Sequence, residues 1–171
     1  MGVKAARAAL AAVILIGSGA MGDEASGPPK LGPETNLPLP RFVSLKSENA
    51  NVRRGPGLTH RVDWVFIRRG MPLEVIAEHG HWRRVRDVED SGGWVHFAML
   101  RGERSGVVTT PRAALRKEPD RAAALVALAE AGAILHLKEC RKDWCEAEAD
   151  GVEGWLSKSE FWGALPDETF D

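Results

Sequence analysis

The chain has 171 residues, which is room for one ordinary domain or for two small ones. A hydrophobic fraction of 44% and a charged fraction of 27% are ordinary for a globular protein, which excludes a disordered tail protein and a polytopic membrane protein. The 23 Lys and Arg residues against 24 Asp and Glu residues leave a net charge of −1, so a general nucleic-acid binder is also excluded.

The first 22 residues have the pattern of a secretory signal peptide. Lys4 and Arg7 precede an apolar run over residues 8–16, and small residues follow it. The run is much shorter than the roughly 20 residues of a membrane-spanning helix, and no second apolar stretch approaches that length. We expect cleavage after Ala20 or Gly22 and a mature protein in the periplasm or outside the cell, with no membrane span. A buried N-terminal helix is the alternative.

Residues 23–40 are predicted to form a proline-rich linker. They hold five prolines and two glycines, a composition that cannot bury a core and that stiffens the chain toward the polyproline conformation. The alternative is a PxxP-type ligand segment at residues 37–41. In both cases the folded part of the chain is expected to begin near Phe42.

A repeat divides the rest of the chain into two units. Three groups of anchors recur in one order at a nearly constant offset, and only two single-residue gaps are needed to align them. The anchors are residues 51–57 (N-V-R-R-G-P-G) over 114–120 (A-L-R-K-E-P-D), Gly70 and Trp82 over Gly132 and Trp144, and 93–95 (G-W-V) over 154–156 (G-W-L). The predicted units are residues 41–104 and 105–165, and residues 166–171 remain as an acidic tail.

Within each unit the apolar residues alternate, which predicts strands with one buried face. Leu73 and Val75 flank Glu74, and the same pattern recurs in the second unit at residues 135–137. Closely spaced short strands, with turn residues between them, are typical of a small antiparallel barrel. Residues 122–130 have a strong helix preference, but the repeat aligns them with the strand around residue 65, so a strand is predicted there.

The motif residues resemble the bacterial SH3-like (SH3b) domain, whose pattern is an N-V-R-x-G-P opening, a W-x-x-V strand and a closing G-W-V. The first unit has N-V-R-R-G-P, W-R-R-V and G-W-V in this order. The second unit departs from the pattern, because Glu118 replaces the glycine and Ala147 replaces the valine. The resemblance implies an all-β fold of two tandem SH3-like barrels, and the whole layout is similar to that of exported SH3-domain proteins of Gram-negative bacteria.

Four tryptophans fall at repeated positions and are expected to play two different roles. Trp94 and Trp155 each follow a glycine that lets another backbone approach, so we expect them to be core indoles that close the two barrels. Trp82 and Trp144 begin strands beside polar turns, where one face of the indole can stay in contact with water. They are candidates for a ligand groove.

The two cysteines are predicted to form a disulfide. Cys140 and Cys145 bracket a predicted hairpin turn, and facing strand positions lie about 5.5 Å apart at Cα, within disulfide geometry. A zinc site or a redox pair is the weaker alternative, because the ligand set and the spacing are wrong. In the first unit the same positions are Glu78 and Arg83, which we expect to form an exposed ion pair worth well under about 1 kcal/mol.

No catalytic machinery is recognisable. Two units, the leader and the linker leave no room for a separate hydrolase domain. A Ser-His-Asp arrangement in motif context, an H-E-x-x-H motif and a phosphate loop are absent. The five histidines are scattered, and a solvated side chain is the expectation for each. We therefore predict no enzyme activity, no metal site and no cofactor.

Charge is distributed unevenly between the units. Residues 41–105 hold 12 basic and 8 acidic residues, a net +4, whereas residues 106–171 hold 8 basic and 13 acidic residues, a net −5. Arginines of the first unit could bind carboxylates in a bidentate manner, dock against the acidic second unit, or form a solvated face. The candidate ligand-binding residues are Trp82, Arg53, Arg54, Arg84 and Arg86.

The resemblance implies a non-enzymatic binding or adaptor protein that recognises peptidoglycan, its peptides or an envelope protein. No nucleic-acid partner is expected. The alternative is a purely structural or regulatory interaction protein in which the two units pack into one rigid body and bind no small ligand.

Overall fold

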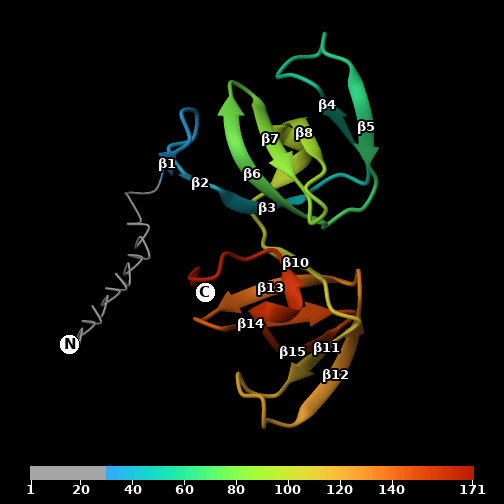
Figure 1. Ribbon diagram of the computed structural model, residues 1–171, viewed down its shortest axis with the longest axis vertical. Helices are drawn as coiled ribbons and strands as arrows, with labels where there is room; N and C mark the ends of the chain where they lie inside the picture. The colour runs from blue at the N-terminus through green and yellow to red at the C-terminus, as the bar shows by residue number, and fades with distance from the viewer. Residues whose placement is uncertain (1–29) are drawn as a thin grey trace, which may run out of the picture.

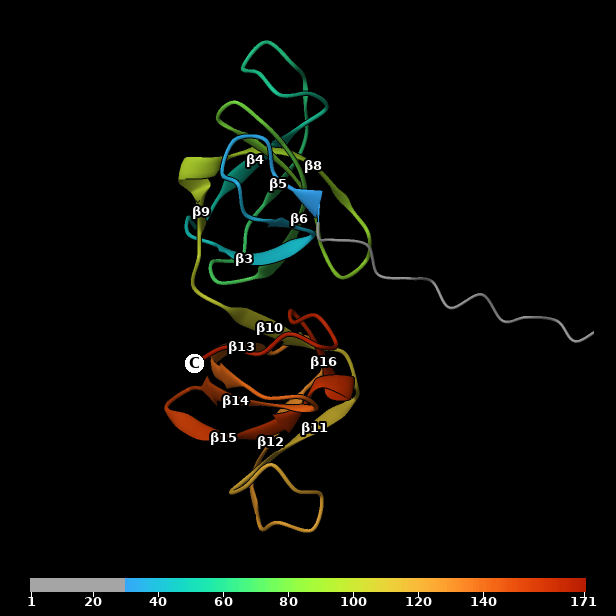
Figure 2. The same cartoon turned by 90° about the vertical axis from the view of Figure 1, so that its left-hand side faces the viewer.

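The structure, a computed structural model, describes residues 30–171 as two β-units placed one above the other along the long axis of the molecule (Figure 1). A view turned by 90° shows the same two units (Figure 2). The predicted signal peptide and residues 23–29 of the predicted linker lie outside the described residues. Over residues 30–171, no helix is long and apolar enough to cross a lipid bilayer.

The first unit is a seven-stranded antiparallel sheet with the order β5-β4-β8-β7-β6-β3-β9. Its elements are β3 (Arg41–Leu45), β4 (Ala50–Arg53), β5 (Val62–Phe66), β6 (Pro72–His79), β7 (Trp82–Arg86), β8 (Gly92–His96), the 3-10 helix η1 (Phe97–Met99) and β9 (Leu100–Arg101). The strands β6, β7 and β8 form a continuous meander, because short turns join them.

The second unit is also a seven-stranded antiparallel sheet, with the order β12-β11-β15-β14-β13-β10-β16. Its elements are β10 (Ser105–Val108), β11 (Arg112–Arg116), β12 (Leu125–Glu130), β13 (Ile134–Cys140), β14 (Trp144–Ala149), β15 (Val152–Ser157), the 3-10 helix η2 (Lys158–Glu160) and β16 (Phe161–Trp162). The order matches that of the first unit strand for strand, so the predicted duplication and the all-β fold class are confirmed.

Local details of the backbone repeat as well. Gly70 and Gly132 both adopt the left-handed conformation, with φ of 78° and 80°, in the turns before β6 and β13. Each amide N–H ties the turn to the last residue of a strand much earlier in the chain, since Gly70 donates to the carbonyl of Leu45 in β3 and Gly132 donates to that of Val108 in β10. The alignment of these two glycines therefore reflects one turn built twice.

The stretch with the strongest helix preference is a strand, as the repeat predicted. Strand β12 pairs with β11 from Glu130 opposite Arg112 to Leu125 opposite Arg116. Hydrogen bonding to a neighbouring strand and burial of Ala129 in the core outweigh the intrinsic preference of an alanine-rich sequence, which is worth only a fraction of a kcal/mol per residue.

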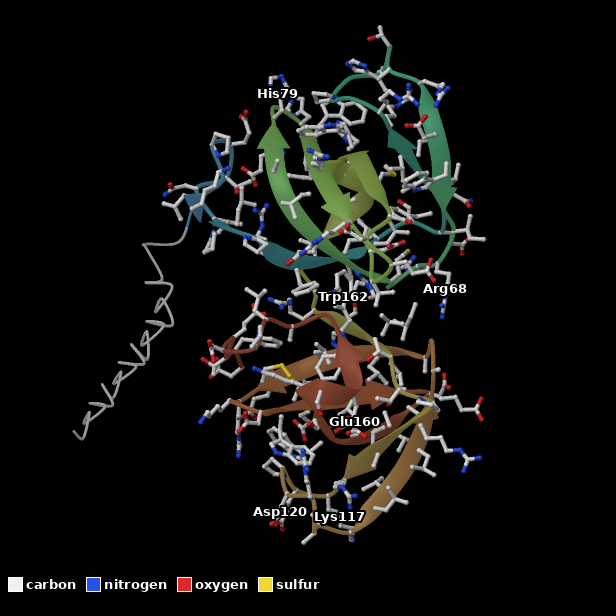
Figure 3. The ribbon with its side chains drawn as sticks, viewed as in Figure 1. Arg68, His79, Lys117, Asp120, Glu160 and Trp162 are labelled. Carbon is white, nitrogen blue, oxygen red and sulfur yellow. A yellow bond between two sulfur atoms is a disulfide. The ribbon has the colours of Figure 1, made fainter. Side chains whose placement is uncertain are left out.

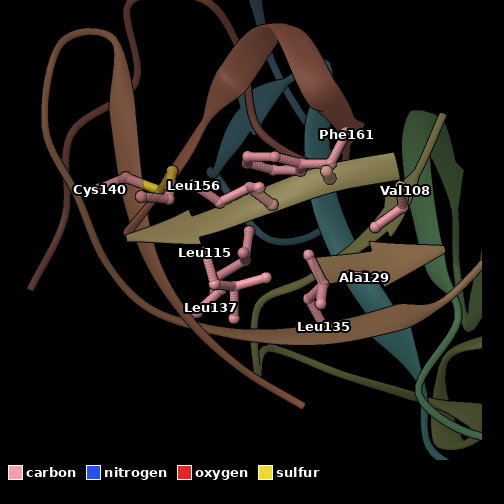
Figure 4. Packing of buried hydrophobic residues seen from close by; sticks show 11 residues of the cluster. Val108, Leu115, Ala129, Leu135, Leu137, Cys140, Leu156 and Phe161 are labelled. Atoms are coloured by element: carbon pink, nitrogen blue, oxygen red, sulfur yellow. A yellow bond between two sulfur atoms is a disulfide. The ribbon is translucent and has the colours of Figure 1, made fainter. Parts of the chain in front are cut away.

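Each unit has its own hydrophobic core. The first is formed mainly by Leu45, Val52, Leu73, Val75, Val85 and Val95, all nearly inaccessible to solvent. The second, drawn in Figure 4, contains Val108, Leu115, Leu135, Leu137, Leu156 and Phe161 together with the cysteine pair. The period-two alternation correctly predicted the inward positions of Leu73, Val75, Leu135 and Leu137.

The two closing indoles differ from the prediction because adjacent residues of a strand point to opposite faces. In both units it is the residue after the tryptophan, Val95 or Leu156, that enters the core. Trp94 is only half-buried and lies on the outer face of its sheet, so its assignment to the core was wrong. Trp155 is buried, as expected, but outside the core cluster and beneath the guanidinium of Arg141, whose central carbon lies 4.5 Å from the ring centroid.

The described part of the predicted linker is folded, which corrects the prediction of a spacer for residues 30–40. The strands β1 (Lys30–Leu31) and β2 (Pro38–Leu39) form a hairpin, called here the N-terminal arm. Leu39 is buried in the first core, and the turn of the arm is bound by Glu78. The composition of the arm indicated a spacer because it contains few residues that could form a core. The arm is instead held by burial of Leu39 and by the distant carboxylate of Glu78, which composition does not reveal.

The predicted acidic tail is also packed. Phe170 and Cys140 exchange two backbone hydrogen bonds of 2.7 and 3.1 Å, and the carboxylate of Glu168 binds the guanidinium of Arg104. Burial would raise the pKa of Glu168, but hydrogen bonds from Arg104 and from the backbone of Leu165 lower it below its usual value. The tail therefore forms part of the surface of the second unit.

The two units contact each other through named side chains (Figure 3). Phe42 and Trp162 meet edge to face with their ring centroids 4.7 Å apart. Arg68 donates a hydrogen bond of 2.8 Å to the carbonyl oxygen of Gly132. These contacts join the two units directly.

Candidate functional site

The repeated hairpin in the first unit has the predicted register but not the predicted environment. Glu78 lies directly opposite Arg83, and its Oε1 is 3.5 Å from the guanidinium Nε. The pair is buried rather than exposed, because the N-terminal arm covers it. At the equivalent positions of the second unit Cys140 and Cys145 form the predicted disulfide.

The carboxylate of Glu78 binds several groups of the arm at once. It accepts hydrogen bonds from the amides of Glu34 and Thr35 at 3.0 Å, from the hydroxyl of Thr35 at 2.7 Å and from Arg41 at 2.6 Å. Burial alone would raise its pKa, but these hydrogen bonds outweigh burial and lower the pKa of Glu78 to about 2. This cluster attaches the arm, and two of its residues, Arg41 and Arg83, also line a hollow of about 1070 Å³ to which both units contribute.

The main candidate site is a hollow of about 580 Å³ on the outer face of the first unit, called here the Trp82 groove. Outward positions of β4, β7 and β8 form its floor, and the loop after β4, the 3-10 helix η1 and neighbouring turns form its walls. The lining residues are Asn49, Asn51, Arg53, Leu58, His81, Trp82, His96 and Met99. The groove thus combines an indole with amide, imidazole and guanidinium groups.

Aromatic rings border the groove. Trp82 is half-buried and meets His96 edge to face at 5.4 Å, and His96 in turn lies 4.9 Å from the ring of Phe97. His81 completes the border at 5.5 Å from Phe97. These contacts fix the orientation of the indole while one part of it remains accessible, as the sequence predicted for Trp82.

Arg53, a predicted ligand residue, has a structural task in this groove. Its Nη1 donates hydrogen bonds to the carbonyl oxygens of Leu58 at 3.0 Å and His60 at 2.7 Å, so it holds the loop that forms one wall. Its Nε and Nη2 make no hydrogen bond with any part of residues 30–171. Arg53 can therefore hold the wall and still offer two donors to a ligand.

The other predicted arginines lie around a second hollow, which shares Arg53 with the Trp82 groove, and carboxylates of the protein bind two of them. This hollow has about 580 Å³ and is also lined by Trp94. Arg54 is 3.4 Å from Asp63, and Arg86 binds both Glu74 and Asp90.

Arg84, in contrast, is exposed and forms no ion pair within the described part of the chain. Arg53 lines both hollows, so the predicted residues are spread over two hollows that meet at this side chain: Trp82 lies in the first, and Arg54, Arg84 and Arg86 lie in the second. Of the predicted arginines around the second hollow, Arg53 and Arg84 form no ion pair with a carboxylate of the described residues, whereas Arg54 and Arg86 do.

Sequence reasoning missed most of the polar lining of the Trp82 groove. Asn51 and His96 lie on strands that are distant in sequence, and both point outward because their neighbours Val52 and Val95 point inward. The period-two pattern from those core residues was the available signal. Across residues 30–171, no three His, Cys, Asp or Glu side chains are placed to hold a metal ion.

A comparison with protein-family models agrees with this architecture. The family described as "Bacterial SH3 domain" matches residues 46–102 and again residues 109–163. The two matches together cover most of the chain and coincide with the two sheets, so this chain belongs to the bacterial SH3 domain family and contains two such domains in tandem.

Two solved structures are similar to the chain. They are NlpC2 and NlpC1 from Trichomonas vaginalis, both at 12% sequence identity, with TM-scores of 0.34 and 0.35. The similarity covers 72% and 77% of this chain, which spans 48% of each of those two chains. No curated protein matches the sequence.

Proposed function

We propose that the protein is an exported, non-enzymatic binding protein that recognises the peptide part of peptidoglycan through the Trp82 groove. The observation that carries this proposal is the groove itself: a preformed hollow of about 580 Å³ with an oriented, accessible indole among polar groups. Binding sites commonly combine such an apolar surface with a few placed polar groups. The charged leader predicted at residues 1–22 supports export.

The chemistry of the lining suits an extended peptide. The indole of Trp82 offers a flat surface for an aliphatic side chain or for the plane of a peptide bond. The side-chain amide of Asn51 can both donate to and accept from a peptide group. The free Nε and Nη2 of Arg53 can bind a carboxylate in a bidentate manner.

The experiment is retention of the full chain on purified cell-wall sacculi at low and at high salt. We expect Trp82→Ala to lower the retained fraction about fivefold or more, because a buried aromatic contact is worth at least about 1 kcal/mol. Trp64→Ala is the matched control, since Trp64 is an exposed indole of the same unit outside the groove. Equal retention of the two variants, or no retention of the native chain, contradicts the proposal.

A structural or regulatory interaction protein is the second candidate. It is favoured by the internal pairing of Arg54 and Arg86, which occupies two of the predicted ligand residues, and by the contact between Phe42 and Trp162 that joins the units. In that case sacculi retain no protein at any salt, and a purified envelope protein is bound equally by the native chain and by Trp82→Ala.

A further inference from the structure

The second unit has a hollow in the same place as the Trp82 groove. It consists of two adjoining parts of about 740 and 240 Å³ that share Arg121, Trp144, Ser157 and Ser159. Asp143 lines the larger part, and Glu160 lines the smaller one. We call this feature the Trp144 groove.

The correspondence between the grooves extends to their construction. Arg116 is the repeat equivalent of Arg53 and lines the smaller part of the Trp144 groove. Its Nη1 donates a hydrogen bond of 2.8 Å to the carbonyl of Ala123. Ala123 is in turn the repeat equivalent of His60, whose carbonyl accepts from Arg53 at 2.7 Å. Equivalent arginines therefore hold equivalent loops in the two units, and the two hollows occupy equivalent positions in the repeat.

The lining of the second groove has different chemistry. Apolar or aromatic residues of the Trp82 groove are replaced by charged or hydroxyl residues at the repeat positions, while the indole is kept. The replacements are Leu58 by Arg121, His81 by Asp143, His96 by Ser157 and Met99 by Glu160. Residues of both charges thus surround the indole of Trp144.

Several of these charges have no internal partner. Within residues 30–171 the side chains of Arg121, Lys142 and Asp143 form no ion pair and no hydrogen bond, and all three are exposed. Lys158 is different, because its ammonium group donates to carbonyl oxygens of the tail, and burial lowers its pKa. The unpaired groups of both signs are available to a ligand.

We propose that the Trp144 groove is a second ligand site, and that it takes a peptide end carrying both an ammonium and a carboxylate group, as a C-terminal lysine does. The aliphatic part of the ligand packs on the indole of Trp144. Its ammonium group binds Asp143 or Glu160, and its carboxylate binds Arg121 or Lys142.

The position of the two grooves makes the molecule bivalent. Leu58 and Arg121 belong to loops between β4 and β5 and between β11 and β12, and these loops lie at opposite ends of the long axis (Figure 1). Figure 3 shows Asp120, a neighbour of Arg121 in this loop, at the end of the second unit that is farthest from the first. The two sites therefore face separate segments of a partner.

The test uses the indole N–H signals of the full chain in NMR spectra, assigned with single Trp→Phe variants. The probe is N-acetyl-Ala-Ala-Lys with a free carboxylate. We expect the Trp144 signal to shift in a saturable way at millimolar concentrations, and Asp143→Asn or Glu160→Gln to weaken this binding about fivefold. Glu153→Gln, which changes an exposed carboxylate paired with Lys138, is the matched control and should leave the affinity unchanged.

Two modified probes separate the charges. Replacing the lysine by norleucine removes the ammonium group, and replacing the carboxylate by an amide removes the negative charge; each should weaken binding about fivefold. The proposal is overturned if the Trp144 signal does not move up to about 10 mM probe, or if both modified probes bind as well as the original. Because the readout is the Trp144 signal, the result does not depend on whether the Trp82 groove binds the cell wall.

Discussion

Glu78→Gln is the substitution that tests most directly how the N-terminal arm is attached. It removes the negative charge of a carboxylate that accepts hydrogen bonds from Glu34, Thr35 and Arg41. The same carboxylate lies opposite the guanidinium of Arg83. The amide keeps the size of the side chain, so the change is electrostatic. We expect the arm to detach from β6 and the first unit to lose stability.

The size of the effect follows from the pKa. The pKa of Glu78 is about 2 in the folded protein against 4.5 for an unperturbed glutamate, and each unit of difference corresponds to about 1.4 kcal/mol. The charged carboxylate therefore contributes about 3 kcal/mol at neutral pH. Since the folded pKa is the lower one, this contribution is present above pH 4.5 and is lost as the pH falls toward 2.

The assay is urea unfolding of the full chain, followed through the backbone NMR signals of β6 and β7 between pH 7 and pH 2. The native chain and Glu78→Gln should differ by about 3 kcal/mol at pH 7, and the difference should vanish near pH 2. Glu103→Gln, which affects an exposed pair with Arg101, is the control and should cost less than about 1 kcal/mol. A difference between the native chain and Glu78→Gln that stays constant with pH would refute the reasoning.

Three further predictions concern the scaffold. Reduction of the Cys140–Cys145 disulfide releases a short closed loop in the unfolded state and should cost the second unit about 2 kcal/mol in thermal unfolding; an unchanged melting temperature would contradict this. Gly92→Ala would place a Cβ 1.9 Å from the carbonyl oxygen of Val85 and should destabilise the first unit by about 2 kcal/mol or more, whereas Gly102→Ala, with open space around it, should be neutral in the same urea titration. Trp162→Ala removes the contact with Phe42 and should let the two units tumble separately in NMR relaxation; joint tumbling would show that other contacts suffice.

The repeat was the part of the sequence that predicted most. Its alignment placed Glu78 opposite Arg83 and Cys140 opposite Cys145, and both pairs face each other in the structure. It also predicted a strand at residues 125–130 against the local helix preference. A repeat is informative in this way because two copies of one fold must satisfy the same pairing pattern, whatever the local preference of each copy.

The orientation of the indoles was harder to predict. In β8 and β15 a tryptophan precedes an aliphatic residue, and only one of two adjacent residues can enter the core. The aliphatic residues Val95 and Leu156 do so, which leaves Trp94 on the outer face and places Trp155 under Arg141. The aliphatic alternation of the neighbouring strands, rather than the size of the indole, was the relevant signal.

The arginines show a similar limit. A run of basic residues in the first unit indicated a surface for carboxylate ligands, yet Arg54 and Arg86 are bound to carboxylates of the protein itself. One of these, Glu74, is on the neighbouring strand and buried, at a position where the alternation also allowed an exposed side chain. Net charge per unit therefore says little about the charge that remains for a partner.

From the sequence alone one could derive the two-fold repetition, the pairing across one hairpin of each unit and the disulfide, because these depend on spacing and on alternation along the chain. Three features required the folded structure: the folded arm, the pairing of individual arginines, and the set of residues that share a groove with Trp82 or Trp144. These features depend on contacts between segments that are far apart in the sequence, such as Glu78 with Thr35, and no local pattern records which distant group will be there.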